Sequence, residues 1–401
     1  MSALFILCLA YSVSLFYRGM ISVIAPELAI DLALDDSSLG LLSSTFFISF
    51  AVAQVPAGLA LDRYGARLTV GLFLWFSVLG SVLFCSADSE LQAFVGQALI
   101  GVGCAPVFTG SMLFIGRQFS PDKFAYITAL VIALGSVGDL FGTTPLALLV
   151  QSWGWRLALV VPMILTALVA CLCLQSLPAD RPKKAQQPLS FMLAGMVRVI
   201  QVRQLWPVIP MFLASYAVLM AIRGLWSGPY LADVFALDGG ERGMIILAMS
   251  LAMAVGTFFL GLLDRRLGCT KMVALISSLV TLIPLVFLAL RPAQGPYFAM
   301  WAFVVVGLFG FNYPLLMSHC RSFLAPDYHG RGMALLTALS FIGVALVQST
   351  SGWVIEAAAS AGLDAPGQYR MLFVLLTSAL ALASLVYSFS PTHGNEDQPS
   401  R

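Results

Sequence analysis

Apolar stretches of about twenty residues recur along the whole chain, and they restrict its fold more than any other feature. The chain is 60% hydrophobic and only 10% charged, whereas a soluble domain carries roughly 25% charged residues. A helix of that length crosses the hydrocarbon core of a bilayer. We therefore predict an all-α membrane protein with twelve transmembrane helices, at about 2–26, 38–61, 68–87, 92–115, 124–150, 157–177, 205–232, 243–263, 272–290, 297–319, 332–355 and 369–389.

The longest polar interruption, from about 178 to 204, divides the chain into two halves and is rich in Pro, Lys and Arg. If both termini are cytoplasmic, most Lys and Arg residues lie on the cytoplasmic side, as the positive-inside rule requires. We therefore predict cytoplasmic N- and C-termini. The predicted parts are an N-terminal six-helix bundle (1–180), a basic cytoplasmic linker (181–204), a C-terminal six-helix bundle (205–390) and a polar cytoplasmic tail (391–401).

The two halves repeat each other at an offset of about 205 residues. Tyr11 followed by Arg18-Gly19 matches Tyr216 followed by Arg223-Gly224, and Thr128-Ala-Leu matches Thr337-Ala-Leu further on. Matches in the same order indicate a duplicated six-helix unit, an arrangement found in transporters.

One loop carries a family resemblance. The segment Gly58-Leu-Ala-Leu-Asp62-Arg63-Tyr64-Gly65-Ala66-Arg67 resembles the signature loop between the second and third helices of the major facilitator superfamily, and Asp264-Arg265-Arg266-Leu267-Gly268 resembles a degenerate copy. The resemblance implies a secondary transporter whose loop latches the cytoplasmic gate. Gating is therefore expected of Gly58, Asp62, Arg63, Gly65 and Arg67; the alternative is topological anchoring by charge. We expect Gly58 to permit close helix packing and Gly65 a tight turn.

Features of the first helix resemble two particular branches of this superfamily. Arg18 lies eight residues before Pro26, and Gln54-Val-Pro56 leads into the loop. This pattern is similar to the anion:cation symporter and organophosphate:phosphate antiporter branches. The resemblance implies that Arg18 contacts an anionic substrate and that Arg223 is its counterpart in the seventh helix, although Arg223 lies only six residues before Pro229.

Arg18 and Arg223 both lie inside apolar stretches. A guanidinium there costs several kcal/mol unless it is paired or faces water, and its fork suits a carboxylate or phosphate. We expect an anion clamp at mid-membrane; alternatively, Arg18 pairs with a helix carboxylate or extends towards an interface. Tyr11 and Tyr216 share a helix face with these arginines, and each either binds a substrate oxygen or packs in the core.

Other polar residues inside the spans leave alternatives open. A buried carboxyl at Asp139 is a candidate proton-coupling site, or it is the permanent counter-ion of Arg18 or Arg223. Asn312, Tyr313 and Gln348 either line the substrate cavity or form hydrogen bonds between helices.

No enzyme signature is present. The sequence contains no Walker loop, no nucleophile–base motif and no Cys/His cluster for a metal, so we expect no enzymatic activity, cofactor or metal. A net charge of +2 gives no reason to expect nucleic-acid binding.

We predict a secondary active transporter that carries a small organic anion by alternating access, with proton symport as the energy coupling and anion exchange as the second choice. The rivals are a proton-driven exporter of drug-like or siderophore-like compounds and a membrane ligand sensor that does not transport. The expected partners are the anion, protons and the lipid bilayer. The compact loops and the lack of a recognised organelle-targeting signal favour a bacterial inner membrane. We read the N-terminus as an uncleaved first helix and expect a monomer.

Overall fold

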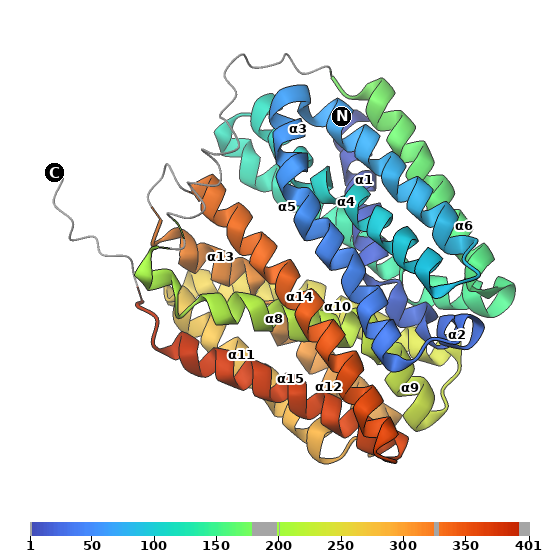
Figure 1. The fold of residues 1–401 in the computed structure, drawn as a ribbon. Helices are drawn as coiled ribbons and strands as arrows, with labels where there is room; N and C mark the ends of the chain where they lie inside the picture. The colour runs from blue at the N-terminus through green and yellow to red at the C-terminus, as the bar shows by residue number, and fades with distance from the viewer. Residues whose placement is uncertain (1, 179–198, 200, 325–328, 393–401) are drawn as a thin grey trace. The chain divides into compact units, whose positions relative to one another are not determined.

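The computed structural model describes residues 2–178, 199, 201–324 and 329–392. In these ranges every regular element is helical (Figure 1). Most of the predicted linker and tail lie outside the described residues. The first half of the chain contains α1 (Ser2–Gly19), α2 (Ile21–Leu32), α3 (Asp36–Cys85), α4 (Glu90–Gln118), α5 (Pro121–Phe141) and α6 (Thr144–Ser176). The second half contains η1 (Arg203–Leu205), α8 (Ile209–Ala221), η2 (Ile222–Trp226), α9 (Ser227–Phe235), α10 (Gly239–Leu267), α11 (Thr270–Leu290), α12 (Pro296–Gly310), α13 (Tyr313–Arg321), α14 (His329–Ser360) and α15 (Ala365–Ser388).

Helices long and apolar enough to cross a membrane dominate the described chain. Nine such helices occur there, and α1 with α2 forms a tenth candidate that is bent by 49°. The chain is therefore an all-α, multi-pass membrane protein.

Two of the long helices are interrupted by a glycine. The 50 residues of α3 would extend about 75 Å, more than twice the hydrocarbon thickness of about 30 Å. Gly65 breaks α3 with φ 77° and ψ −179°, and Gly154 breaks α6 with φ 77° and ψ 161°. Only glycine adopts this backbone conformation readily. Gly65 thus makes the predicted turn between the two arms of α3.

The helices form two compact units. The first comprises Met1–Gln186 with Arg223–Leu247, and the second comprises Gln187–Ile222 with Ala248–Arg401. The residues Arg223–Leu247 come from the predicted C-terminal bundle but cluster with the first unit, because α9 packs against α2.

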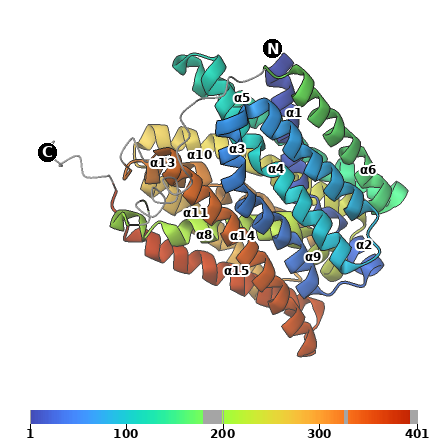
Figure 2. The same ribbon diagram turned by 45° about the horizontal axis from the view of Figure 1, so that its top comes forward.

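Within the first unit, α3 packs along α4 and α6, and α1 packs on α5 (Figures 1 and 2). Glycines allow these helices to approach closely: a Cβ added to Gly96 would lie 2.9 Å from the carbonyl oxygen of Gly80. Small residues take this role in membranes, where helices gain nothing from excluding water.

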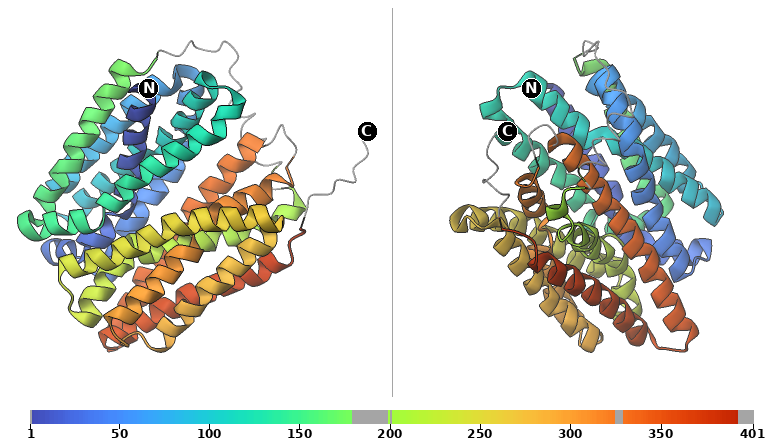
Figure 3. Two further views of the ribbon diagram at one scale, coloured as in Figure 1. Left: turned by 180° about the vertical axis from the view of Figure 1, so that it is seen from behind. Right: turned by 60° about the vertical axis from the view of Figure 1, so that its left-hand side comes forward.

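Within the second unit, α8 packs on α14 and α15, while α11 packs on α15 and α12 (Figures 1 and 3). The predicted tenth span is broken between α12 and α13, at Phe311 and Asn312. Broken helices inside membranes need other groups to take over the backbone or side-chain hydrogen bonds at the break.

Candidate functional site

Arg223 and Asp139 form a buried ion pair within the first unit. Their whole-residue exposures are 1% and 7%, and an Arg223 Nη2 group donates to an Asp139 carboxylate oxygen. The same nitrogen lies 3.4 Å from the Asp139 backbone oxygen. Arg223 belongs to the π-helical turn η2, and such turns are frequent at functional sites. The pair compensates two charges that would each be costly in the membrane interior.

The guanidinium of Arg223 also lies against the break in the first predicted span. A Cβ added to Gly19 would lie 2.9 Å from the Arg223 Cζ and would collide with Nη1. Gly19 ends α1, and α2 continues at an angle of 49° from Ile21. The hydroxyl of Ser22 donates to the Gly19 carbonyl at 3.0 Å. The absence of a side chain at Gly19 therefore allows Arg223 to reach the α1–α2 bend.

Arg18, next to Gly19 on α1, is partly buried. Its Cζ atom lies 4.9 Å from the ring centroid of Phe50 on α3, within the range of a cation–π interaction. The two predicted clamp residues are thus both placed at the α1–α2 bend, but in different surroundings. Arg223 pairs with Asp139, and Arg18 lies over the aromatic face of Phe50.

Tyrosines of α1 pack against neighbouring helices. Tyr11 is 9% exposed and its ring lies 5.2 Å from that of Phe108 on α4. Tyr17 is 2% exposed, and its hydroxyl lies 2.8 Å from Ser81 Oγ and 3.0 Å from Thr166 Oγ1. Tyr17 therefore ties α1 to α3 and α6 at the level of Arg18.

Tyr216 of α8 is the centre of an aromatic group in the second unit. Its ring centroid lies 5.8 Å from Phe311, 5.8 Å from Tyr313 and 5.9 Å from Phe341. We call these four residues the Tyr216 cluster. Tyr216, Phe311 and Tyr313 are each partly exposed, and Phe341 is 6% exposed. The Tyr313 hydroxyl lies 2.9 Å from Thr337 Oγ1.

Asn312 is fully engaged in hydrogen bonds at the break between α12 and α13. It is 1% exposed. Its Oδ1 accepts from Ser215 Oγ at 2.5 Å, and its Nδ2 donates to Ser278 Oγ at 2.7 Å, to Ser277 Oγ at 3.2 Å and to the Ala274 carbonyl at 3.3 Å. Hydrogen bonds between helices were one of the two roles predicted for Asn312 from the sequence. In the structure its side chain joins the break to α8 and α11.

Gln348 of α14 has no exposed surface. Its Nε2 donates to the Met220 carbonyl of α8 at 3.2 Å, just before the π-helical turn. Its Oε1 is buried without a hydrogen-bond partner among the described residues. Like Asn312, Gln348 joins helices in this structure.

The predicted gating loop is tied to α6 by one residue. Arg67 Nε donates to the Leu174 carbonyl at 2.6 Å. Asp62 and Arg63 are exposed, and Arg63 lies 5.1 Å over the Tyr64 ring. The expectation that Gly58 permits close helix packing was wrong: a Cβ added there would meet no atom within 4 Å, so the packing does not require a glycine.

Two ion pairs were not predicted from the sequence. Glu27 of α2 accepts from Arg242 of α10 at 2.5 Å, with Arg242 7% exposed. Asp31 of α2 accepts from Trp155 Nε1 at 2.9 Å and from Arg156. Each acid lies far from its partner in sequence, so no local spacing reveals either pair. Both connect α2 to other parts of the first unit.

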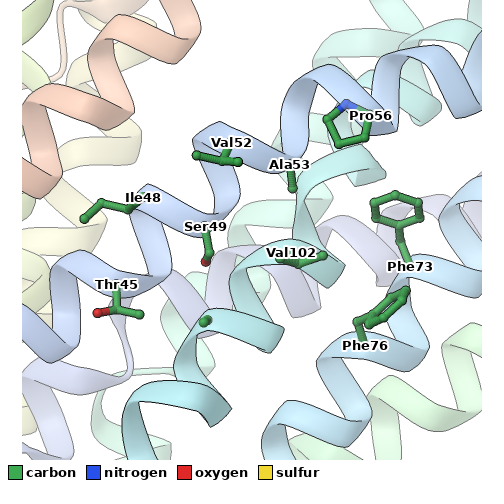
Figure 4. Close-up of a pocket in the computed structure, with 10 residues that line it drawn as sticks. Thr45, Ile48, Ser49, Val52, Ala53, Pro56, Phe73, Phe76 and Val102 are labelled. Carbon is green, nitrogen blue, oxygen red and sulfur yellow. The ribbon is translucent and has the colours of Figure 1, made fainter. Parts of the chain in front are cut away.

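A pocket of about 510 Å³ opens between α3 and α4 (Figure 4). Its lining includes no charged residue and consists of Thr45, Ile48, Ser49, Val52, Ala53, Pro56, Phe73, Phe76, Ala98 and Val102. The Ser49 hydroxyl already donates to the Phe46 carbonyl at 3.0 Å. An apolar lining of this kind does not suit an anion, so we place the candidate site at the arginines instead.

The comparisons with known proteins identify the family. Residues 7–227 and 211–401 match the Major Facilitator Superfamily. The chain therefore belongs to this superfamily of membrane transporters, which are not enzymes. The D-xylose-proton symporter structure superposes with a TM-score of 0.79 at 13% identity, over 98% of each chain, and this likeness shows the fold alone.

Two curated relatives carry names of organic anions. The probable galactarate/D-glucarate transporter of Bacillus subtilis is 27% identical over 48% of this chain and 44% of that protein. The gentisate transporter of Corynebacterium glutamicum is 23% identical over 91% of this chain and 83% of that protein. The chain thus spans less than half of the first relative and most of the second. These relatives support the anion:cation symporter branch suggested by the first helix.

Proposed function

We propose that this chain is a secondary transporter that carries a small organic anion across a bacterial inner membrane by alternating access, coupled to protons. The observation that carries the proposal is Arg18: a partly buried guanidinium in an apolar helix, beside an aromatic ring and at a helix bend. Ionisable residues inside membrane spans are rare, and they mark substrate or ion pathways. The two relatives, named for galactarate/glucarate and gentisate transport, support an anion as the substrate.

The proposed topology has twelve spans and cytoplasmic termini. Gly65 separates two arms of α3, each long enough to cross a bilayer. The run from Leu130 to Ser176 is 47 residues long and contains the Gly154 break, so it supplies two spans as well. Nine helices of the described chain are candidate spans, and the bent α1–α2 pair is a tenth. Because α3 and the run from Leu130 to Ser176 each supply two spans, the described candidates become twelve.

Proton coupling is assigned to the Asp139–Arg223 pair. A proton on Asp139 removes the negative charge that neutralises Arg223. The guanidinium then carries a net positive charge in the membrane interior, which favours the entry of an anion. The anion in turn favours protonation, since binding of the two ligands is thermodynamically reciprocal. This linkage is what a symporter requires.

The test is transport by purified protein in liposomes under an imposed proton gradient, with D-glucarate and gentisate as probes. We expect proton-driven accumulation by the unaltered protein and its loss in Arg18→Ala. The matched control is Arg370→Gln, which removes an exposed arginine of α15 and should leave transport unchanged. Accumulation that is independent of Arg18 would contradict the anion role. Probe binding without accumulation would instead indicate the sensor, and efflux of cationic amphiphiles would indicate the exporter.

A further inference from the structure

The pocket between α3 and α4 lies among side chains that are exposed although they are apolar. In its lining, Val52 is 69% exposed, Ile48 46% and Phe76 42%. All three belong to a helix that is apolar enough to span a membrane. Apolar side chains of such helices are compatible with lipid chains, which are as apolar as they are. We therefore expect lipid chains at the mouth of this pocket.

Small residues leave the space that the pocket occupies. On the arm of α3 before Gly65, Ser49 and Ala53 point towards α4 (Figure 4). Phe73 and Phe76, on the arm after Gly65, line another side. The volume of about 510 Å³ is in the range of sites for small ligands. An apolar cavity of this kind excludes water and takes up apolar molecules.

The hydroxyl groups in the lining are used within their own helix. Ser49 Oγ donates to the Phe46 carbonyl at 3.0 Å, and Thr45 Oγ1 donates to the Leu41 carbonyl at 2.8 Å. The lining contains no charged residue. A polar occupant would lose its hydrogen bonds to water here and gain little in return. The pocket therefore favours a hydrocarbon chain.

One face of α3 joins this pocket to a basic residue. Arg63 follows Pro56 by seven residues and Val52 by eleven, and residues at these intervals share a helix face. At 1.5 Å per residue, Arg63 lies about 16 Å along the helix from Val52. One leaflet of the hydrocarbon core is about 15 Å deep. When Val52 lies near the centre of the membrane, Arg63 is therefore at the level of the lipid head groups.

Arg63 is suited to the phosphate of a head group. It is exposed, and its Cζ lies 5.1 Å from the ring centroid of Tyr64, which is 49% exposed. Tyrosine is typical of membrane–water interfaces, and the guanidinium fork fits a phosphate. The neighbouring acid, Asp62, is also exposed, but it points about 100° away around the helix. The face that Arg63 shares with the pocket thus carries a positive charge at its end.

We propose that the pocket and the face of α3 up to Arg63 bind one phospholipid with a net negative head group. One acyl chain of this lipid fills the pocket, and its phosphate contacts Arg63. The occupant is a lipid and not the transported anion, because the lining is apolar and the charge that complements the head group lies one leaflet depth away.

The experiment is native mass spectrometry of the purified, delipidated protein, titrated with phosphatidylglycerol, which is anionic, or with phosphatidylcholine, which is zwitterionic. Ala98→Phe fills the pocket, Val52→Trp narrows its mouth at an exposed position, and Arg63→Gln removes the charge. Thermal unfolding of each variant establishes that it is folded.

Two matched variants serve as controls. Val255→Trp makes the same change at a residue of α10 that is 61% exposed, and Arg370→Gln removes an exposed arginine of α15. Neither residue lines the pocket.

We expect the first phosphatidylglycerol molecule to bind about fivefold more tightly than phosphatidylcholine. Arg63→Gln should abolish this preference and retain phosphatidylcholine. Ala98→Phe and Val52→Trp should each weaken the binding of both lipids by about tenfold, and the controls should bind like the unaltered protein. Undiminished lipid binding by the folded pocket variants, or an unchanged preference in Arg63→Gln, would overturn the proposal. So would a protein dimer without bound lipid, which would assign the groove to a second copy of the chain.

Discussion

The carboxylate of Asp139 on α5 and the guanidinium of Arg223 on η2 neutralise each other inside the first unit. The two residues are 84 positions apart in the chain. Their pairing places Arg223, which is 1% exposed, against the α1–α2 bend at Gly19, the residue after Arg18. We therefore expect a charge change at Asp139 to affect, through Arg223, the part of the first helix that we propose for the substrate.

Removing the Asp139 charge should uncouple transport and destabilise the protein. Asp139→Asn leaves Arg223 buried without its counter-charge, which costs about 3–5 kcal/mol for a fully buried pair. We expect a lower unfolding temperature and loss of proton-driven accumulation, measured by thermal unfolding and liposome uptake.

The double variant Asp139→Asn/Arg223→Gln is the control for that prediction. With both charges removed, no buried ion remains unpaired, and most of the lost stability should return. Proton-driven accumulation should stay absent. Recovery of accumulation in the double variant would show that the pair has only a structural role.

A methyl group at Gly19 should disturb the same pair through Arg223. In Gly19→Ala the new Cβ collides with the Arg223 guanidinium, and overpacking of this kind costs about 1–3 kcal/mol. Gly58→Ala is the matched control because a Cβ there meets no atom within 4 Å. Its helical position should even gain up to about 1 kcal/mol. Equal thermal shifts in the two variants would contradict the contact between Gly19 and Arg223.

The sequence located the charged residues of the candidate site but not their pairing. Apolar length and the internal repeat indicated a helical membrane protein and singled out Arg18, Arg223 and Asp139. Two counter-ions remained possible for Asp139, because no local spacing decides between residues on different helices. The structure pairs Asp139 with Arg223, since η2 brings Arg223 onto α5.

Long-range contacts were beyond sequence reasoning for the same reason. Glu27 and Arg242 are 215 positions apart, so no local spacing reveals their pairing. Asn312 and Gln348 are polar residues in apolar helices, a pattern equally typical of a cavity and of a helix contact. Only the positions of Ser215, Ser278 and the Met220 carbonyl show which partners they have.

The Glu27–Arg242 pair should show measurable coupling. The exposed fractions of the two side chains are 35% and 8%, so solvent screens the pair only in part. A double-mutant cycle with Glu27→Gln and Arg242→Gln should give a coupling energy of about 1–2 kcal/mol. The comparison is Asp31 with Arg156, whose side chains are 41% and 37% exposed and should couple by less than about 1 kcal/mol. A weaker coupling at Glu27 than at Asp31 would contradict this order.

Gly65 and Gly154 offer a matched test of the gating loop. Each has φ 77° with extended ψ, a conformation that costs a residue with a Cβ about 1–3 kcal/mol. Gly65→Ala and Gly154→Ala should therefore lower the unfolding temperature by similar amounts. Gly65, however, lies two residues before Arg67, which bonds the loop to α6, whereas Gly154 lies outside the signature segment. If the loop governs opening and closing, Gly65→Ala lowers the rate of probe uptake more than Gly154→Ala does at equal stability, because the strain displaces the Arg67 contact with Leu174. Equal uptake rates in the two variants would indicate that the loop only anchors the topology through its charges.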